Sequence, residues 1–295
     1  DDDTATLPEY DLGEAGNAFR EEVRDWLQVH WTGERKAAFD RQPFHDREFD
    51  ASFAKDMGRT GWIGLAWPKE HGGQARSARE QLAFVEVMER AEAPRIGAGV
   101  QANALLMHGT PAQQARWLPE ILRGEAMHGM GYSEPQAGSD LAALKTRAVR
   151  DGDHWVINGR KWFTTGANVA AYTTVMARTE PEAPPHAAFS MIIVPTDTPG
   201  YTIVREVPVM GMYGGHCEVV YDQVRVPRKN LLGERGAGFL IAQQRLGPGR
   251  IFHCMRWLGQ AQRAFDMMCE RALTRSAFGS PLAEKQQVQQ MIFET

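Results

Sequence analysis

The stretch of sequence that decides the fold reads Met130-Gly-Tyr-Ser-Glu-Pro-Gln-Ala-Gly-Ser-Asp140. It combines small residues, two serine hydroxyls and the rigid Pro135, at the point where helical spacing of apolar residues gives way to strand-like alternation. Such a loop lets backbone N–H groups approach a ligand closely while serine oxygens hydrogen-bond to it. The alternative is a capped turn between two domains, with Ser139 or Asp140 as the N-cap. The composition of the loop leaves both interpretations open.

Upstream of this loop the sequence predicts helices. Thr110-Pro111 signals a helix start, because a hydroxyl caps free N–H groups and proline fits the first helical position. The range 62–73, with Pro68 and two glycines, is expected to be a loop. Apolar residues at helical spacing predict one helix with Phe19, Val23, Trp26 and Leu27 on its buried face and another with Leu82, Val85, Val87 and Met88.

Downstream of the loop the apolar period shortens toward two, which predicts a β-domain. Asp151-Gly152 and Asn158-Gly159 are expected in tight turns, since such pairs accept positive φ. Strands are expected at Thr146–Val149, Trp155–Ile157, Met191–Val194, Tyr201–Val204 and Val219–Val226, with a loop at Thr179–Pro185. After Gly238 helical spacing returns, and a further helix is expected near Pro281. Because the sequence stops at Thr295 within an amphipathic pattern, we expect a fragment of a longer chain.

The composition excludes several classes of protein. With 295 residues, 43% of them hydrophobic and 24% charged, the chain is expected to be globular and to hold more than one domain. Lys+Arg 33 against Asp+Glu 37 argues against a nucleic-acid binder. No apolar run approaches the ~18 residues of a membrane span, and the start Asp1-Asp2-Asp3 is unlike a signal peptide. Three cysteines without C-x-x-C spacing fit a reducing compartment, so we expect a cytoplasmic protein.

Common catalytic motifs are absent from the sequence. There is no H-E-x-x-H, no Cys/His cluster at zinc spacing and no Walker loop, so no metal is expected. Residues 131–135 fail the G-x-S-x-G pattern at its fifth position. The glycines of 233–238 occur in the wrong order for a dinucleotide-binding loop. Hydrolase, kinase and nicotinamide-dependent functions are therefore disfavoured.

Two further segments carry chemistry. Residues 159–166 read Gly-Arg-Lys-Trp-Phe-Thr-Thr-Gly, and aromatic rings beside hydroxyls suit a planar heteroaromatic ligand. A strand end whose aromatics belong to the core is the alternative. The segment 271–287 contains Arg275-Ser-Ala-Phe-Gly-Ser-Pro-Leu282 and then Gln286. Here the alternative is an exposed helix end with Arg275 near its C-terminus, where a cation is favourable.

Together, in this order and spacing, the three segments resemble the acyl-CoA dehydrogenase family of FAD flavoproteins. The family pattern combines x-x-[ST]-E-P-x-A-G-S-D, G-x-K-x-[WF]-x-[TS] and R-x-x-F-G-x-P-[LI], which this chain matches at 131–140, 159–165 and 275–282. The resemblance covers essentially the whole chain. It implies a multidomain α+β fold, with an N-terminal helical domain (1–126), a β-barrel-like middle domain (127–235) and the first part of a C-terminal helical bundle (236–295).

The resemblance also implies roles for individual residues. Thr165 takes the position whose hydroxyl bonds flavin N5, Phe163 lies beside the isoalloxazine, and Ser139 lies near the FAD phosphates and the thioester-carrying arm. Arg275, Phe278 and Gln286 match positions that hold the FAD of a neighbouring subunit, which implies a homodimer or homotetramer. Arg250 matches an arginine on the CoA side of the pocket. The remaining implied flavin-binding residues are Met130, Tyr132, Ser133, Gly138 and Thr164.

The implied reaction is α,β-dehydrogenation of an acyl-CoA thioester, with electrons passing to an electron-transfer flavoprotein. A carboxylate removes the α-proton while hydride leaves the β-carbon for N5. The family's usual base lies after the R-x-x-F-G helix, and we expect it beyond Thr295. Some members carry it just before the arginine matched by Arg250, but Gly249 occupies that position. Ala277 replaces a hydroxyl residue common in the family and so removes one possible FAD contact.

Two alternatives remain open at this stage. The chain could be a non-catalytic, FAD-holding subunit of a hetero-oligomer, which tolerates loss of the base. It could also be a flavin oxidase or monooxygenase, since these enzymes share the fold. The acyl chain is not specified by the sequence. A eukaryotic member would be expected in the mitochondrial matrix or peroxisome instead of the cytoplasm.

Overall fold

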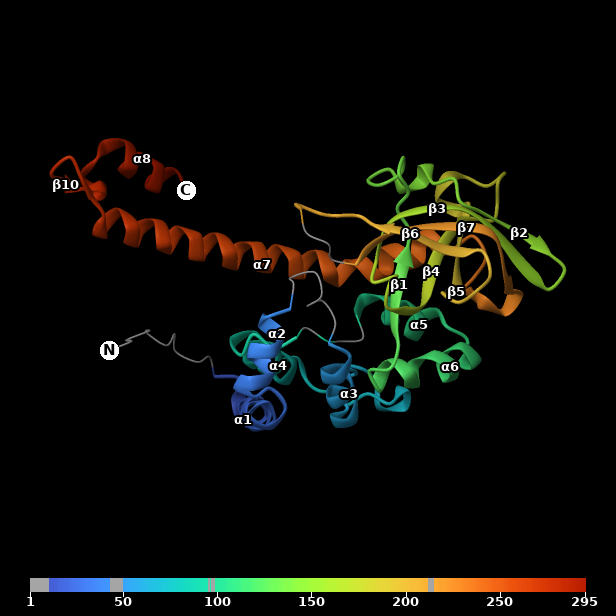
Figure 1. Ribbon diagram of the computed structural model, residues 1–295, viewed down its shortest axis with the longest axis horizontal. Helices are drawn as coiled ribbons and strands as arrows, with labels where there is room; N and C mark the ends of the chain where they lie inside the picture. The colour runs from blue at the N-terminus through green and yellow to red at the C-terminus, as the bar shows by residue number, and fades with distance from the viewer. Residues whose placement is uncertain (1–10, 43–49, 95, 97–98, 212–214) are drawn as a thin grey trace. The chain divides into compact units, whose positions relative to one another are not determined.

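The computed structural model describes residues 11–42, 50–94, 96, 99–211 and 215–295 (Figure 1). The acidic start Asp1–Asp3 lies outside these residues. The chain divides into two compact units, Asp1–Ala242 and Gln243–Thr295, which are described separately. The first unit begins with the helices α1 (Gly13–His30), α2 (Gly33–Asp40), α3 (Ala51–Thr60), α4 (Ala78–Arg90), α5 (Gly99–His108) and α6 (Pro111–Leu122).

The start of α6 is the one that Thr110-Pro111 predicts. Thr110 Oγ1 accepts a hydrogen bond from the Gln113 backbone N–H at 3.2 Å, and Gln113 Oε1 accepts one from the Thr110 N–H at 2.9 Å. This capping box satisfies two N–H groups that the helix cannot pair internally. Gln113 Nε2 also donates to the carbonyls of Lys229 and Leu231, so α6 is fixed against the end of the β-region.

The predicted buried faces of the first helices are partly confirmed. α1 buries Phe19, Val23 and Leu27, as expected. On α4 the prediction is wrong for Leu82 and Val85, which are 54% and 52% exposed. The helix instead buries Ala83, Val87 and Met88. Because Leu82 and Val85 lie three residues apart, they share a face of their own that points away from the core.

The β-region follows α6 and forms one eight-stranded sheet (Figure 1). Its order is β6-β7-β3-β2-β4-β5-β8, and β1 pairs in parallel with β4 off this path. Asp151-Gly152 connects β2 to β3, with Gly152 at φ 57°, as the sequence predicts. The strands are β1 (Met127–Gly131), β2 (Arg147–Asp151), β3 (His154–Thr165), β4 (Ala170–Arg178), β5 (Phe189–Pro195), β6 (Tyr201–Glu206), β7 (His216–Pro227) and β8 (Leu231–Leu232).

Asn158-Gly159 does not form the predicted turn. The pair lies inside β3, where the register against β7 shifts between Ile157 and Gly159. Asn158 Oδ1 accepts a hydrogen bond from the Gln223 N–H at 2.9 Å, so the side chain fills the gap in the ladder. A Cβ at residue 159 would stand 2.3 Å from Thr146 Oγ1, which requires glycine for close approach of the chains. The dipeptide marks a β-bulge and not a hairpin.

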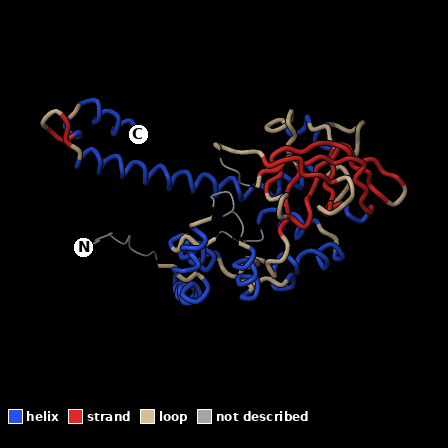
Figure 2. Tube along the Cα trace, in the orientation of Figure 1, coloured by secondary structure: helices blue, strands red, loops and turns tan. Residues whose placement is uncertain are grey.

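Two apolar clusters cover opposite faces of the sheet. One, which includes Trp155, Val194 and Tyr221, fills the space enclosed by the strands. The other joins the helices to the strands, since it contains Phe19 of α1 as well as Tyr172 and Met191 of β4 and β5. Figure 2 shows the helical part of the unit beside its strands. β4 and β5 are buried on both faces, because one cluster covers one face of these strands and the other cluster covers the opposite face.

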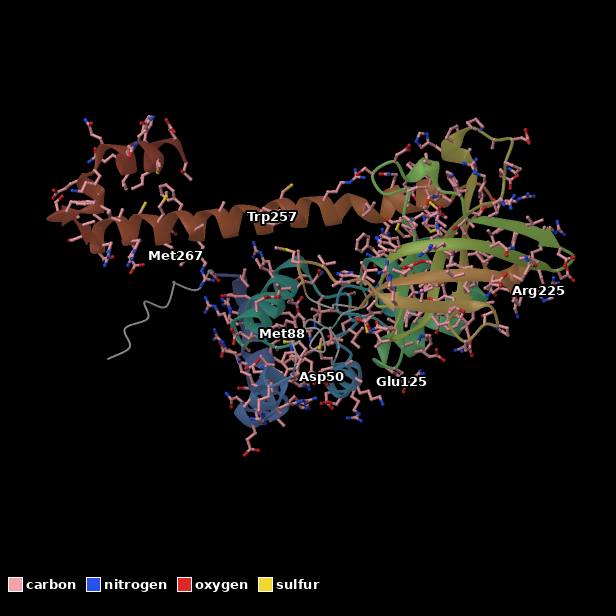
Figure 3. All side chains as sticks on the ribbon, turned by 45° about the horizontal axis from the view of Figure 1, so that its top comes forward. Asp50, Met88, Glu125, Arg225, Trp257 and Met267 are labelled. Atoms are coloured by element: carbon pink, nitrogen blue, oxygen red, sulfur yellow. The ribbon has the colours of Figure 1, made fainter. Side chains whose placement is uncertain are left out.

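The second unit contains most of α7 (Gly238–Thr274), the hairpin β9–β10 (Ser276–Ala277, Ser280–Pro281) and α8 (Gln286–Glu294). Helices resume where the sequence predicts, so the expected order of helices, strands and helices is confirmed. Trp257 and Met267, labelled in Figure 3, are 67% and 58% exposed on α7. No helix among the described residues has both the length and the apolar character that crossing a membrane requires.

Candidate active site

The fold brings the first two chemistry-bearing segments side by side. β1 ends at Gly131 beside β4, and the chain then passes over β3, where Ser133 O accepts a hydrogen bond from the Trp162 N–H at 2.8 Å. The start of the loop at Ser133 therefore lies directly beside the end of β3, although 29 positions separate Ser133 from Trp162 in the sequence. Between Glu134 and Ala137 the loop closes on itself through two backbone hydrogen bonds of 2.9 and 3.0 Å.

A buried ion pair joins the loop to the strand. Lys161 Nζ lies 3.0 Å from Glu134 Oε1 and donates to Tyr132 O at 2.8 Å, and the two charged side chains are 0% and 2% exposed. The Glu134 carboxylate also accepts the backbone N–H groups of Lys145 and Thr146 at 2.7 and 2.9 Å. One ion pair therefore fixes the end of β1, the loop, the segment before β2, and β3. Neither residue was assigned a role from the sequence.

The pKa values of this pair show opposing effects of burial and partnership. Burial lowers the pKa of Lys161 from 10.5 to about 8, and the Glu134 carboxylate offsets this only in part. Burial alone would raise the pKa of Glu134, but the Lys161 charge and the hydrogen bonds from Thr146 and Lys145 outweigh it and leave that pKa below its ordinary value. Glu134 therefore stays ionised and holds the loop.

The Phe163 side chain on β3 is partly exposed to solvent. Its φ is +53°, a left-handed conformation that is costly for an aromatic residue, and its ring is 46% exposed. The register against β7 shifts between Lys161 and Thr164, so one extra residue in β3 forms a bulge there. The ring makes edge contacts with Trp162 and His216, with centroids 5.6 and 6.2 Å apart.

The two threonines after Phe163 face opposite sides of the sheet. Thr165 is exposed, and its Oγ1 lies 2.9 Å from His216 Nδ1 on β7. Thr164 is fully buried, and its Oγ1 has no hydrogen-bond partner in the described part of the chain. The structure thus brings the Phe163 ring and the Thr165 hydroxyl to one surface. It leaves only the backbone of Thr164 available there.

The loop residues differ in how they are presented. Gly138 and Ser139 are exposed, and a Cβ at residue 138 would meet no heavy atom within 4 Å. Tyr132 is half-buried, with its hydroxyl donating to Met191 Sδ at 3.3 Å. Asp140 precedes a short 3-10 helix but makes no side-chain cap, so the N-cap interpretation is wrong for Asp140. Met130 and Ser133 are half-buried at the same end of the unit.

The third segment lies in the second unit. Phe278 and Gly279 form the tight turn of the β9–β10 hairpin with φ of +55° and +83°, and the Phe278 side chain is fully exposed. Arg275 is exposed, and its carbonyl accepts the Leu282 N–H at 2.8 Å. Gln286 is exposed at the start of α8, and Arg250 on α7 donates to Gln243 at 2.6 Å. These four side chains are directed to solvent, where a ligand or another subunit can reach them.

His216 is the other site residue that the sequence did not reveal. It stands opposite Thr165 because antiparallel pairing of β3 with β7 joins residues 51 positions apart. No motif in the sequence near either residue predicts this pairing. The Phe163 ring, the Thr165 hydroxyl and the His216 imidazole lie together. Such a group can stack on one face of a planar heteroaromatic ligand and hydrogen-bond to its edge.

Comparison with known families covers almost the whole chain. The N-terminal, middle and C-terminal domain models of acyl-CoA dehydrogenase match residues 13–125, 129–224 and 236–295. The probable acyl-CoA dehydrogenase FadE2 of Mycobacterium tuberculosis is 52% identical over 196 residues, which are 65% of this chain and 48% of that protein. The chain thus spans about half the length of this relative.

Solved structures give the same result at the level of the fold. A variant of the Tcur3481-Tcur3483 steroid acyl-CoA dehydrogenase matches with a TM-score of 0.77 and 33% identity, over 95% of this chain and 72% of that one. The ChsE4-ChsE5 complex of Mycobacterium tuberculosis matches with a TM-score of 0.72 and 32% identity, over 98% and 73%. Each of these proteins carries two component names, and the second is described as a complex.

Proposed function

The chain belongs to the acyl-CoA dehydrogenase family, and on this premise we propose that it takes part in FAD-dependent α,β-dehydrogenation of an acyl-CoA thioester. The observation that carries the proposal is the exposed Phe163 ring in a left-handed backbone conformation beside the Thr165 hydroxyl. A sheet does not maintain an exposed, strained aromatic residue for its own stability. A ligand that stacks on the ring and bonds to the hydroxyl accounts for both.

The residues present fit FAD. The Phe163 ring and the hydroxyls of Ser133 and Thr165 suit the isoalloxazine, while the open backbone at Gly138 and the Ser139 hydroxyl suit phosphate oxygens. When bound, FAD supplies the hydride acceptor. The chain's own contribution is to orient the ring system through Phe163 and to offer the Thr165 hydroxyl at its edge. The Glu134–Lys161 pair holds the two segments in place for this task.

The general base is assigned to a carboxylate outside residues 1–295. At the earlier family position stands Gly249, which has no side chain that could accept a proton. Arg250 follows it directly and is exposed on α7, where its guanidinium suits the anionic CoA portion of the substrate. We therefore propose that a carboxylate outside this segment abstracts the proton from the α-carbon, while hydrogen bonds to the thioester carbonyl stabilise the developing charge.

The exposed Arg275, Phe278 and Gln286 are assigned to the FAD of a neighbouring subunit. Each is directed to solvent within the second unit, and a guanidinium is a strong partner for a pyrophosphate. The functional protein is then a homodimer or homotetramer. An electron-transfer flavoprotein is the proposed electron acceptor. The cytoplasm is the proposed compartment, or the mitochondrial matrix or peroxisome in a eukaryote.

A second candidate is an FAD-holding subunit of a hetero-oligomer that lacks its own base. Gly249 favours it, as do the two-component names of the structural relatives. In that assembly the chain would contribute Arg275, Phe278 and Gln286 to a partner's cofactor while the partner supplies the carboxylate.

The visible spectrum of the full-length protein, recorded before and after anaerobic addition of acyl-CoA thioesters of different chain types, tests these proposals. Bleaching of the flavin band by one thioester is expected and identifies the acyl class. A flavin-containing protein that no thioester bleaches, but that does bleach with a second subunit added, supports the hetero-oligomer. Rapid recovery of the band in air would indicate an oxidase. A protein that takes up no FAD would contradict both dehydrogenase proposals.

A further inference from the structure

We propose that His216 is a positioning residue that sets whether the Thr165 hydroxyl donates or accepts a hydrogen bond at the flavin. This inference rests on the proposed function, because it concerns the hydroxyl that faces the cofactor. His216 is the first residue of β7 and stands opposite Thr165, the last residue of β3. Its Nδ1 lies 2.9 Å from Thr165 Oγ1, and its ring also meets the Phe163 ring edge-on.

The positions of both residues are fixed by the backbone. The Gly166 N–H donates to Gly215 O at 2.9 Å, directly beside the pair, and the Val207 N–H donates to His216 O at 2.7 Å. β7 is therefore hydrogen-bonded on one side to the end of β3 and on the other to the residue after β6. Since backbone hydrogen bonds hold both strands at this point, the short Thr165 and His216 side chains are brought into contact by the backbone itself.

The chemistry of the contact follows from the number of protons. A hydroxyl has one proton and two lone pairs, and a neutral imidazole has one donor and one acceptor nitrogen. If Nδ1 is unprotonated, the Thr165 hydroxyl donates its hydrogen bond to His216, and its oxygen can only accept from a ligand. If Nδ1 carries a proton, His216 donates to Thr165 Oγ1 and the hydroxyl proton is free to be donated to a ligand.

Such a reversible partner suits a nitrogen that changes from acceptor to donor when it is reduced. The N5 of a bound flavin would make this change on reduction, so a Thr165 hydroxyl held in one of these two arrangements would match one oxidation state and not the other. Within the strand the other acceptor near the hydroxyl is Phe163 O at 3.4 Å, too long for a strong hydrogen bond. His216 is thus the group that can accept a hydrogen bond from the Thr165 hydroxyl or donate one to it.

A double-mutant cycle separates this function from simple packing against Phe163. We would measure the dissociation constants of oxidised and reduced FAD for the full-length protein, T165V, H216F and the double variant T165V/H216F. H216F keeps an aromatic ring beside Phe163 but has no Nδ1. The expected result is that H216F weakens binding of each oxidation state by about two- to tenfold in the unchanged background and has no further effect in T165V.

Two further variants complete the test. H216N should retain binding of both oxidation states within about twofold, because its amide offers a donor and an acceptor at the same side-chain branch. H154F is the matched control, since His154 opens the same strand β3 at its far end, opposite Pro227; it should leave FAD binding unchanged. Unfolding midpoints of all variants distinguish loss of folding from loss of affinity.

The outcomes separate failure of the inference from failure of the proposed function. Equal weakening by H216F with and without Thr165 would overturn the inference, because packing alone would then explain the effect. Unchanged affinity in H216F would overturn it as well, while leaving the proposed function intact if T165V still weakens FAD. If the unchanged protein binds no FAD, the proposed function and the inference both fall.

Discussion

Replacement of Lys161 by methionine is the most demanding test of how the site is held together. Methionine has a similar length and no charge, so K161M leaves the Glu134 carboxylate buried without its counter-ion. Removing one partner of a buried ion pair costs about 3–5 kcal/mol. The backbone N–H groups of Lys145 and Thr146 remain with Glu134 and favour the lower end of that range. We therefore expect the free energy of unfolding to fall by about 3 kcal/mol.

Urea denaturation monitored by tryptophan fluorescence measures this loss, and two variants calibrate it. R225M breaks the Arg225–Asp151 pair on the same sheet, and Arg225 is labelled in Figure 3. The two side chains are 50% and 62% exposed, so this variant should have almost no effect. The double variant K161M/E134Q should recover part of the lost stability, because it removes the uncompensated charge. If K161M were no more destabilising than R225M, the ion pair would not hold the loop.

Three further predictions follow from the same strand. Burial lowers the pKa of Lys161 from 10.5 to about 8, so between these pH values the unfolded chain binds more protons than the folded protein. The free energy of unfolding should therefore rise with pH across this window in the unchanged protein and not in K161M. Urea titrations at several pH values would measure this difference. F163G should lower FAD affinity by up to about tenfold. Its urea midpoint should stay nearly unchanged, because relief of about 1 kcal/mol of left-handed strain offsets the lost ring contacts. A large loss of stability would show that the ring contributes to the core. T164V should raise the free energy of unfolding by about 1 kcal/mol, since it removes a buried hydroxyl that has no hydrogen-bond partner among the described residues. Unchanged FAD titrations would show that Thr164 acts through its backbone alone.

The elements that the sequence predicted correctly are those with a local physical cause. Thr110-Pro111 starts α6 because the capping groups lie within four residues of one another. Asp151-Gly152 turns the β2–β3 hairpin because the turn residues and the paired strands are contiguous. The prediction of a turn from a similar dipeptide is wrong at Asn158-Gly159, where the Asn158 side chain accepts a hydrogen bond from Gln223 on β7, far away in the sequence. A pair that accepts unusual φ serves a bulge as well as a turn, and only the tertiary pairing decides which.

The candidate site was predictable only to the extent that its residues are contiguous in the motifs. Phe163 and Thr165 follow from the segment 159–166, and their exposure agrees with a ligand-facing function. His216 and the connection of Lys161 to Glu134 depend on which strands pair and in which register. The positions of Arg275, Phe278 and Gln286 relative to a cofactor stay predictions, as do the domain limits at 126/127 and 235/236.

The bulge at Trp162–Phe163 explains why the two aromatic and hydroxyl positions lie on one surface. In a regular strand successive side chains alternate, so residues in phase with the buried Lys161 would be 163 and 165. The extra residue shifts this phase by one, which places Phe163 and Thr165 outside and Thr164 inside. The positive φ of Phe163 is the local cost of that shift. The buried Lys161, which precedes the bulge and bonds to Glu134, holds the strand where the phase changes. Strain and ion pair are therefore two parts of one arrangement that exposes Phe163 and Thr165 at the end of an interior strand.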